Sequence, residues 1–386
     1  MKVMAVNKRR IRAVCRLLRD LQCHSRQALL LGEKRTLSMK HSFVFLGLSA
    51  CLFLGSCTQA GKDVLAFQER SFVERFPVER TIVKSEKVDL GVVGIVDVAL
   101  KDSMLFVSTS GSGHPIHLFA YPSLVGKGGF LHKGNGPGEL LYTVFWGYAR
   151  FHVRGDSLLV DIPNGNKNIL VWNASAACRS GETVVYGVPV EIPGTANYRF
   201  VLNDSTLFCR TLSDDQSRLR REIYISGRRV DMPCLAALNE VPVSIRDGYS
   251  FNLLSGVPVY NDSLGVVADA CLAANVINYF SLDSKSRKSV VIGRKAVTVD
   301  KAEASLRLAR GMMRQFFLYG VSDADGCAFL YHDSKYKILL LNWSGEPQEE
   351  VVLPHPASTF CLDRKRGIIW ALDAREDALY KHTLAS

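Results

Sequence analysis

Short apolar runs separated by polar turns recur along most of the chain. The clearest case covers residues 154–175, where a turn at Asp156 and Ser157 precedes the apolar run 158–160. A loop rich in Asn and Gly follows, and a second apolar run covers residues 169–172. Runs of β-favouring residues bounded by turn residues are typical of a β-hairpin. The stretch therefore predicts two antiparallel strands.

The same unit occurs six times. In each copy an apolar run follows the polar turn directly, and a second apolar run begins 12 to 18 residues after the turn. A β-like run precedes each turn and another follows the second apolar run, so each copy predicts four antiparallel strands. The turns lie at residues 102–103, 156–157, 204–205, 262–263, 325–326 and 366–367. The fold class is therefore expected to be all-β, a six-bladed β-propeller over residues 76–386.

Three segments depart from the regular pattern. The last copy has no residues left for a fourth strand, whereas residues 78–84 are β-like and unassigned. We predict that this early segment completes the sixth blade, since ring closure protects sheet edges. Residues 301–315 carry helix formers, which predicts a short helical insertion. Residues 211–222 are charged and are expected to form a long loop.

The start of the chain resembles a bacterial lipoprotein leader. Lys40 precedes an apolar run from Ser42 to Leu54, which is shorter than the about 20 residues of a membrane span. Small residues then lead to Cys57, so residues 39–56 are interpreted as a signal peptide and Cys57 as the lipidation site. Residues 57–75 would be a tether. The alternative is a buried strand or helix that ends in Cys. Residues 1–38 would be disordered or outside the natural protein.

Charge argues against a nucleic-acid partner. The formal net charge is +11, but residues 1–38 contribute +8 and Lys40 contributes +1, which leaves +2 for residues 57–386. A nucleic-acid-binding domain would need a concentrated basic face in its folded part. The expected partners are instead the membrane, through a lipid on Cys57, and an unknown protein or carbohydrate.

The most distinctive loop reads Gly-Asn-Gly-Pro-Gly-Glu at residues 134–139, after the first copy. Pro137 and Gly138 suit the central positions of a β-turn. Together with the leader and the six repeats, this loop resembles the TolB-like six-bladed propeller lipoproteins of Bacteroidetes. The resemblance covers roughly residues 39–386 and implies a cell-envelope address, as an outer-membrane lipoprotein. It supplies no catalytic residues.

The candidate ligand site lies on the face of the propeller that carries this loop. Loops between the second and third strands share that face with the crossovers between blades, and polar groups around a channel mouth are a common kind of binding site. Solvated loops would explain the same residues. The candidates are Asn135, Glu139, His114, Asn164, Asn166, Asn168, His332, Asp333 and Arg375. The Asp-Ser turns on the opposite face are interpreted as structural, with O-glycosylation of Ser103, Ser157 and Ser263 as an alternative.

Catalytic motifs are absent from the sequence. It contains no nucleotide-binding loop, zinc-protease helix motif or nucleophile elbow. His114 and His117 stand three apart and would point to opposite faces of a strand, so they predict no shared metal. The first hypothesis is a non-enzymatic binding or scaffold module without a cofactor. The alternative is a metal-dependent hydrolase of the lactonase type, with Asp97 and Asn203 as the nearest candidates on the channel axis.

Overall fold

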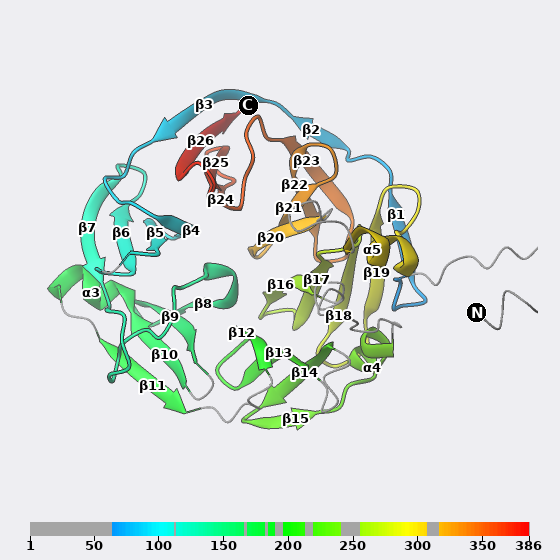
Figure 1. Cartoon of the computed structure of the whole chain (residues 1–386), viewed down its shortest axis with the longest axis horizontal. Coiled ribbons are helices and arrows are strands. Elements are labelled where there is room, and N and C mark those ends of the chain that lie inside the picture. Colours follow the sequence, from blue (N-terminus) through cyan, green and yellow to red (C-terminus); the bar gives the residue numbers. More distant parts are fainter. Residues whose placement is uncertain are drawn as a thin grey trace, which may run out of the picture. The chain divides into compact units, whose positions relative to one another are not determined.

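The computed structural model describes residues 64–111, 113–165, 168–181, 184–189, 196–212, 219–240, 255–306 and 316–385. Six sheets stand around a central channel in this part of the chain, each with its first strand innermost (Figure 1). The protein is a six-bladed β-propeller, as the six repeats predict. In each blade, four consecutive apolar or alternating runs pair as an antiparallel meander, except that the sixth blade takes its outer strand from elsewhere.

The first three blades follow the chain in order. Blade 1 consists of β4 (Ile95–Lys101), β5 (Met104–Thr109), β6 (Ile116–Ala120) and β7 (Val125–Phe130). Blade 2 consists of β8 (Arg150–Arg154), β9 (Ser157–Asn164), β10 (Asn168–Asn173) and β11 (Val185–Pro189). Blade 3 consists of β12 (Ala196–Val201), β13 (Thr206–Leu212), β14 (Leu219–Ile225) and β15 (Arg228–Val230).

The other three blades each include a strand from the start of the chain. Blade 4 consists of β16 (Gly256–Asn261), β17 (Val266–Cys271), β18 (Val276–Ser281) and β19 (Arg287–Ile292), with β1 (Arg70–Val73) at its edge. Blade 5 consists of β20 (Phe317–Ser322), β21 (Gly326–His332), β22 (Tyr336–Asn342) and β23 (Pro347–Val352), with β2 (Val78–Arg80). Blade 6 consists of β24 (Thr359–Asp363), β25 (Ile368–Asp373), β26 (Ala378–Leu384) and β3 (Ile82–Val88).

Residues 64–88, here called the N-terminal belt, run along the outside of blades 4, 5 and 6 (Figure 1). β3 pairs antiparallel with β26, so an early segment does complete the sixth blade. The predicted extent is wrong in part, because residues 78–80 pair in parallel with β23 of blade 5 instead. The apolar pattern shows that a segment is a strand, but it does not show which open edge that strand will join.

The belt begins inside the segment that the sequence assigns to a tether. Phe67 is 2% exposed and Val73 is 6% exposed, and β1 pairs in parallel with β19 over its four residues. Residues 64–75 therefore pack as part of the propeller. The predicted leader at residues 39–56, the lipidation site Cys57 and residues 1–38 lie outside the described residues.

Within the described residues, short helices interrupt the strand pattern at four points. α5 (Val299–Leu306) confirms the predicted insertion between blades 4 and 5, and residues 307–315 lie outside the described residues. η1 (Trp146–Tyr148), α3 (Ala174–Ser180) and α4 (Pro233–Glu240) were not predicted. α3 has a clear local cause, since the side chain of Asn173 accepts a hydrogen bond from Ala176 N at 2.8 Å. No helix within the described residues is long and apolar enough to cross a membrane.

The predicted charged loop at residues 211–222 is wrong in its described part. β13 extends to Leu212 and β14 begins at Leu219, while residues 213–218 lie outside the described residues. Arg221 carries charge into the interior because its Nε donates to Asp269 of β17 in a buried ion pair. The sequence does not reveal this buried partner, so the charge of Arg221 wrongly suggested an exposed loop.

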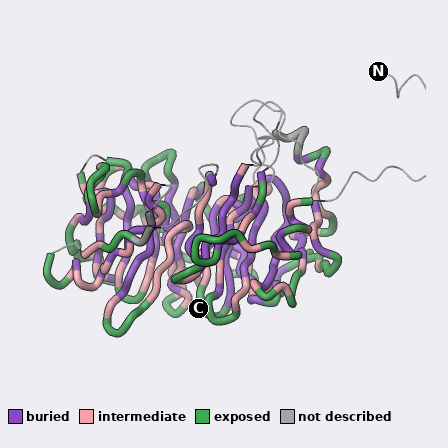
Figure 2. Tube along the Cα trace, turned by 90° about the horizontal axis from the view of Figure 1, so that it is seen from below, coloured by how far each residue is buried: buried purple, intermediate pink, exposed green. Residues whose placement is uncertain are grey.

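Apolar side chains fill the spaces between neighbouring blades. Phe106 of blade 1 and Trp172 of blade 2 are both fully buried and meet edge to face at 6.2 Å between ring centroids. Figure 2 shows buried residues through the strands and exposed ones mainly at the turns on both faces. Cys209 and Cys361 are buried and free, as predicted for small hydrophobic residues. This packing holds the six innermost strands in place around the channel.

Candidate functional site

A cavity of about 480 Å³ occupies the end of the channel at which the Asp-Ser turns lie. All six blades contribute to its wall, mostly through their first strands, and the exposed turn residues Asp262 and Ser263 reach its rim. We call this end of the channel the turn end, and the opposite end the crossover end. The cavity is therefore on the other side of the propeller from the predicted ligand site.

The cavity wall mixes apolar and charged groups. Phe151 and Tyr260 supply aromatic surface, whereas Lys101, Arg364 and Asp323 supply charge. The Lys101 ammonium lies 5.8 Å from the centre of the Phe151 ring, within range of a cation–π contact. Burial lowers the pKa of Lys101, although Asp323 and Asp102 oppose that shift. A ligand here would meet hydrogen-bond donors, acceptors and ring faces together.

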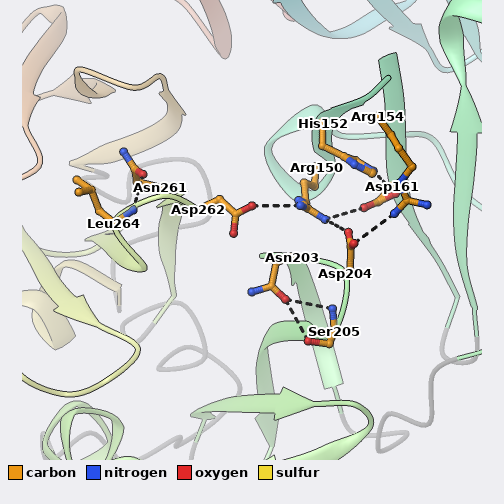
Figure 3. A network of polar contacts seen from close by, with 10 residues as sticks. All are labelled: Arg150, His152, Arg154, Asp161, Asn203, Asp204, Ser205, Asn261, Asp262 and Leu264. Carbon is orange, nitrogen blue, oxygen red and sulfur yellow. Dashed lines mark hydrogen bonds and ion pairs between the residues drawn. The ribbon is translucent and has the colours of Figure 1, made fainter. Parts of the chain in front are cut away.

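Arg150 joins three blades at the rim of the cavity (Figure 3). Its guanidinium lies 2.6 Å from Asp204 of blade 3, 3.2 Å from Asp262 of blade 4 and 3.5 Å from Asp161 of its own blade. Only 14% of its side chain is exposed, so much of its hydration has been replaced by these carboxylates. The arrangement ties blades 2, 3 and 4 together next to the cavity.

Two more side chains of β8 extend this network. Alternate residues of a strand share a face, so Arg150, His152 and Arg154 point the same way. The Nε2 atom of His152 lies 3.0 Å from Oδ1 of Asp161, and Arg154 lies 3.2 Å from Oδ2 of Asp204. The hydrogen bond from Arg150 is the main cause of the lowered pKa of Asp204. We call the six residues the rim network: Arg150, His152, Arg154, Asp161, Asp204 and Asp262.

The rim network was missed by the sequence interpretation. Asp204 and Asp262 lie in turns, where a polar residue is expected, so turn chemistry explained them fully. The usable signal was in β8, which reads Arg-Phe-His-Val-Arg. A first strand lines the channel, and three cationic or titratable residues on one face of such a strand indicate charged partners on the blades that follow it.

Asp97 lies beneath the cavity and is fully buried. Its Oδ2 accepts hydrogen bonds from Trp146 N at 2.7 Å and from the Tyr319 hydroxyl at 2.9 Å, and its Oδ1 accepts one from Val98 N at 2.8 Å. Burial raises the pKa of Asp97 to about 7, although these hydrogen bonds act in the opposite direction. Asp97 thus fastens β4 to η1 and to β20.

The two candidates for a metal ligand on the axis are therefore committed to the protein itself. Both oxygens of Asp97 accept hydrogen bonds from protein groups. The side-chain oxygen of Asn203 accepts bonds from the backbone and hydroxyl of Ser205, at 3.1 and 3.3 Å, and so closes its own turn. These bonds hold both side chains in place within the protein, and the lactonase-type axial site stays a prediction.

At the crossover end, the structure joins two of the predicted site residues. Asn164 is 7% exposed; its amide oxygen accepts from Leu141 N and its amide nitrogen donates to the Glu139 carbonyl, both at 2.8 Å. The Glu139 carboxylate in turn accepts from Gly136 N at 2.7 Å. These bonds fasten the glycine-rich loop to blade 2. Asn164 and Glu139 thus satisfy the backbone of this loop.

Of the other predicted residues, those that the structure describes lie in separate loops or strand ends, apart from the adjacent pair His332 and Asp333, and none of them lines the cavity. The His114 ring bonds to the Leu131 carbonyl at 2.9 Å, His332 packs on Tyr336, and Asp333 accepts hydrogen bonds from the backbone that follows it. Asn135 and Arg375 are exposed. Asn166 and the side chain of Asn168 lie outside the described residues.

Comparisons with known proteins agree on the fold. No protein-family model matches the chain, and no curated protein matches it. A solved structure of a DUF4221 family member from Bacteroides vulgatus is 13% identical, covers 79% of this chain and 97% of that chain, and has a TM-score of 0.50. This likeness shows the β-propeller fold alone.

Two further structures are more distant. A Bacteroides fragilis protein described as exported is 10% identical over 82% of this chain and 98% of that chain, with a TM-score of 0.47. A calcium-binding regucalcin from Agrobacterium tumefaciens is 8% identical over 79% and 95%, with a TM-score of 0.43. Neither likeness bears on what this chain binds. Membership of the TolB-like lipoprotein family stays a prediction.

Proposed function

We propose that the protein is a non-enzymatic binding module that holds a small polar ligand in the cavity at the turn end of the channel. The observation that carries this proposal is the cavity itself, about 480 Å³ in volume and walled by all six blades. That volume lies within the usual range of small-molecule sites, about 300–1,000 Å³.

The lining favours a ligand rich in hydroxyl groups, such as a carbohydrate. Lys101 offers donors and Phe151 an aromatic ring, and the ion pairs Arg364–Asp323 and Arg150–Asp262 add further donor and acceptor atoms to the wall. A sugar presents hydroxyls that both donate and accept, together with an apolar C–H face that packs on aromatic rings. A strongly anionic ligand fits less well, because Arg150 is already engaged by three carboxylates.

We further propose that the propeller is attached to the outer membrane as a lipoprotein through Cys57. The attachment does not specify whether the propeller faces the periplasm or the cell surface. The support is the order of basic, apolar and small residues before Cys57 in the sequence. Incorporation of labelled palmitate into the native chain, and its loss in Cys57→Ala, is the expected result. Equal labelling of both proteins would contradict the attachment.

The ligand proposal is tested by a matched pair of substitutions. Ser263→Trp places a large side chain at the cavity rim, and Ser334→Trp places one in an exposed loop at the crossover end. In a screen of soluble oligosaccharides by saturation-transfer NMR, ligands of the native protein should lose their signal with Ser263→Trp and keep it with Ser334→Trp. Absence of any ligand, or loss in the second variant alone, would overturn the proposal.

The same samples separate binding from catalysis. A bound oligosaccharide incubated with the native protein should be recovered chemically unchanged by mass spectrometry. A cleaved or rearranged product that disappears with Ser263→Trp would replace the binding module with an enzyme that acts in the same cavity.

A further inference from the structure

Three side chains of the rim network could share one cation. They are His152, Asp161 and Asp204, and one ligand atom from each lies within 4.8 Å of the others. His152 and Asp161 come from the neighbouring strands β8 and β9, and Asp204 comes from the turn between β12 and β13 of the next blade (Figure 3). His152 also lines the cavity, so the group stands at the edge of the space that a ligand would enter.

The charge of the rim network leaves room for a cation. Its three carboxylates face two guanidinium groups, those of Arg150 and Arg154, which leaves a net charge of −1 when the imidazole is neutral. This excess of acceptors includes the buried Asp161, whose side chain is 7% exposed. A positive ion would therefore improve the local balance of charge.

The carboxylates can bind a metal without releasing Arg150. Asp161 presents Oδ1 to His152 and Oδ2 to Arg150, so an ion between His152 and Oδ1 would replace only the hydrogen bond that joins these two atoms. Asp204 has Oδ1 on Arg150 and Oδ2 on the exposed Arg154, so Oδ2 could turn to the ion while Oδ1 keeps Arg150. Carboxylates that bind metals in proteins are commonly held by hydrogen bonds from a second layer of side chains. Arg150 occupies such a place, because it contacts Asp161 and Asp204 and is itself anchored by Asp262.

We propose that His152, Asp161 and Asp204 bind a divalent transition-metal ion, with Zn²⁺ as the best fit. Zn²⁺ takes imidazole nitrogen together with carboxylate oxygen and needs only three protein ligands, whereas Ca²⁺ prefers six to eight oxygens. The fourth position of such an ion is open to water or substrate. The ion would link blade 2 to blade 3 and would be an additional binding group for whatever enters the cavity.

The proposal is tested with the metal alone and needs no organic ligand. The native protein is stripped with a chelator and titrated with ZnCl₂ in a calorimeter and with CoCl₂ by visible absorption. We expect one ion per chain and a Co²⁺ spectrum of a four-coordinate site. Each of His152→Gln, Asp161→Asn and Asp204→Asn should weaken binding at least tenfold. Asp204 lies on an exposed turn, so its substitution should leave the fold intact, which circular dichroism would check.

A second histidine pair supplies the matched control. His114 and His132 lie 4.6 Å apart between ring centroids in blade 1 and the crossover that follows it. Binding that is unchanged in the double variant His114→Gln, His132→Gln supports the rim site. Loss of binding in that variant, unchanged binding in Asp204→Asn, or no binding by the native protein would each overturn the proposal. None of these results depends on whether a carbohydrate binds.

Discussion

The two ends of the channel use polar residues in different ways. At the turn end, charged side chains of blades 2, 3 and 4 reach across to one another around Arg150, beside a cavity. At the crossover end, Asn164 and Glu139 bond to the backbone of the loop between blades 1 and 2. The crossover end has the more distinctive sequence, yet the turn end gathers groups from separate blades. Convergence of side chains, rather than density of polar residues, distinguishes a site.

The largest expected effect concerns Asp97, which lies beneath the cavity between the two ends. Burial raises the pKa of Asp97 to about 7 from the ordinary 3.8 of an aspartate, so between these pH values the folded protein holds a proton that the unfolded chain has released. Stability should therefore fall as pH rises from about 4 to 7, by up to about 4 kcal/mol. Urea unfolding across this range should show that slope in the native protein and not in Asp97→Asn.

Asp333 at the crossover end is the control for Asp97. Burial alone would raise its pKa, but backbone N–H groups of Ser334 and Lys335 and the charge of Lys337 lower it. The contribution of Asp333 to stability is therefore lost only as the pH falls below the ordinary pKa of an aspartate. Asp333→Asn should thus keep the native slope between pH 4 and 7. A constant stability difference between Asp97→Asn and the native protein over that range would refute the Asp97 assignment.

The next largest effect is expected from Arg150→Met. This change leaves Asp161, Asp204 and Asp262 without their common partner, and Asp161 is largely buried. Removing one member of a buried ion pair costs about 3–5 kcal/mol, and the exposure of Asp204 and Asp262 should reduce the loss to about 2–3 kcal/mol. Arg375→Met, an exposed arginine at the crossover end, should change the free energy of unfolding by about 0.5 kcal/mol or less. Equal losses of stability in Arg150→Met and Arg375→Met would contradict the proposed difference between the turn end and the crossover end.

Asn164→Ala should cost about 1–3 kcal/mol because it leaves Leu141 N and the Glu139 carbonyl without their partner. Asn135, which is exposed in the glycine-rich loop at residues 134–139, provides the comparison. Asn135→Ala should change the free energy of unfolding very little. Ligand binding at the turn end should survive both changes. If NMR shows that Asn164→Ala abolishes ligand binding while the protein stays folded, the ligand site is at the crossover end and not at the turn end.

The smallest effect is expected from Arg154→Ala. The side chains of Arg154 and Asp204 are 70% and 64% exposed, so their ion pair is well solvated. Such pairs contribute about 0.2–1 kcal/mol and weaken with salt. Chemical unfolding at low and high salt should show a small loss that disappears at high salt. A loss as large as that of Arg150→Met would mean that the rim network acts as one unit.

The sequence predicts the fold well because each blade repeats one local pattern. Six polar turns and their flanking apolar runs mark all six meanders, and the missing outer strand of the sixth blade points to an early segment that supplies it. What the pattern lacks is pairing information: residues 70–73 are assigned to a tether and residues 78–80 to the sixth blade, and the open edges of blades 4 and 5 decide that both segments pair in parallel there.

The site was harder to predict because its residues have adequate local explanations. Asp204 in a turn and Asp161 in a strand have different local settings, and nothing in their sequence spacing indicates that Arg150 lies close to both. Asn164 and Glu139 look available in sequence because the backbone groups that occupy them belong to a loop of special shape. Only the three-dimensional positions of these partners distinguish the converging residues of the rim network from Asn164 and Glu139, which bond to backbone groups.

The N-terminal belt determines when the propeller can close during synthesis. Arg80 and Ala385 are bonded to each other although they stand 305 residues apart, and β3 pairs with β26 beside them. A ribosome releases the belt before the blades and β26 after all the other described strands, so the ring stays open until β26 emerges, with an unpaired edge at blade 6. Closure is therefore a late, slow step of long-range pairing, and a chain truncated before β26 would be left as an open ring.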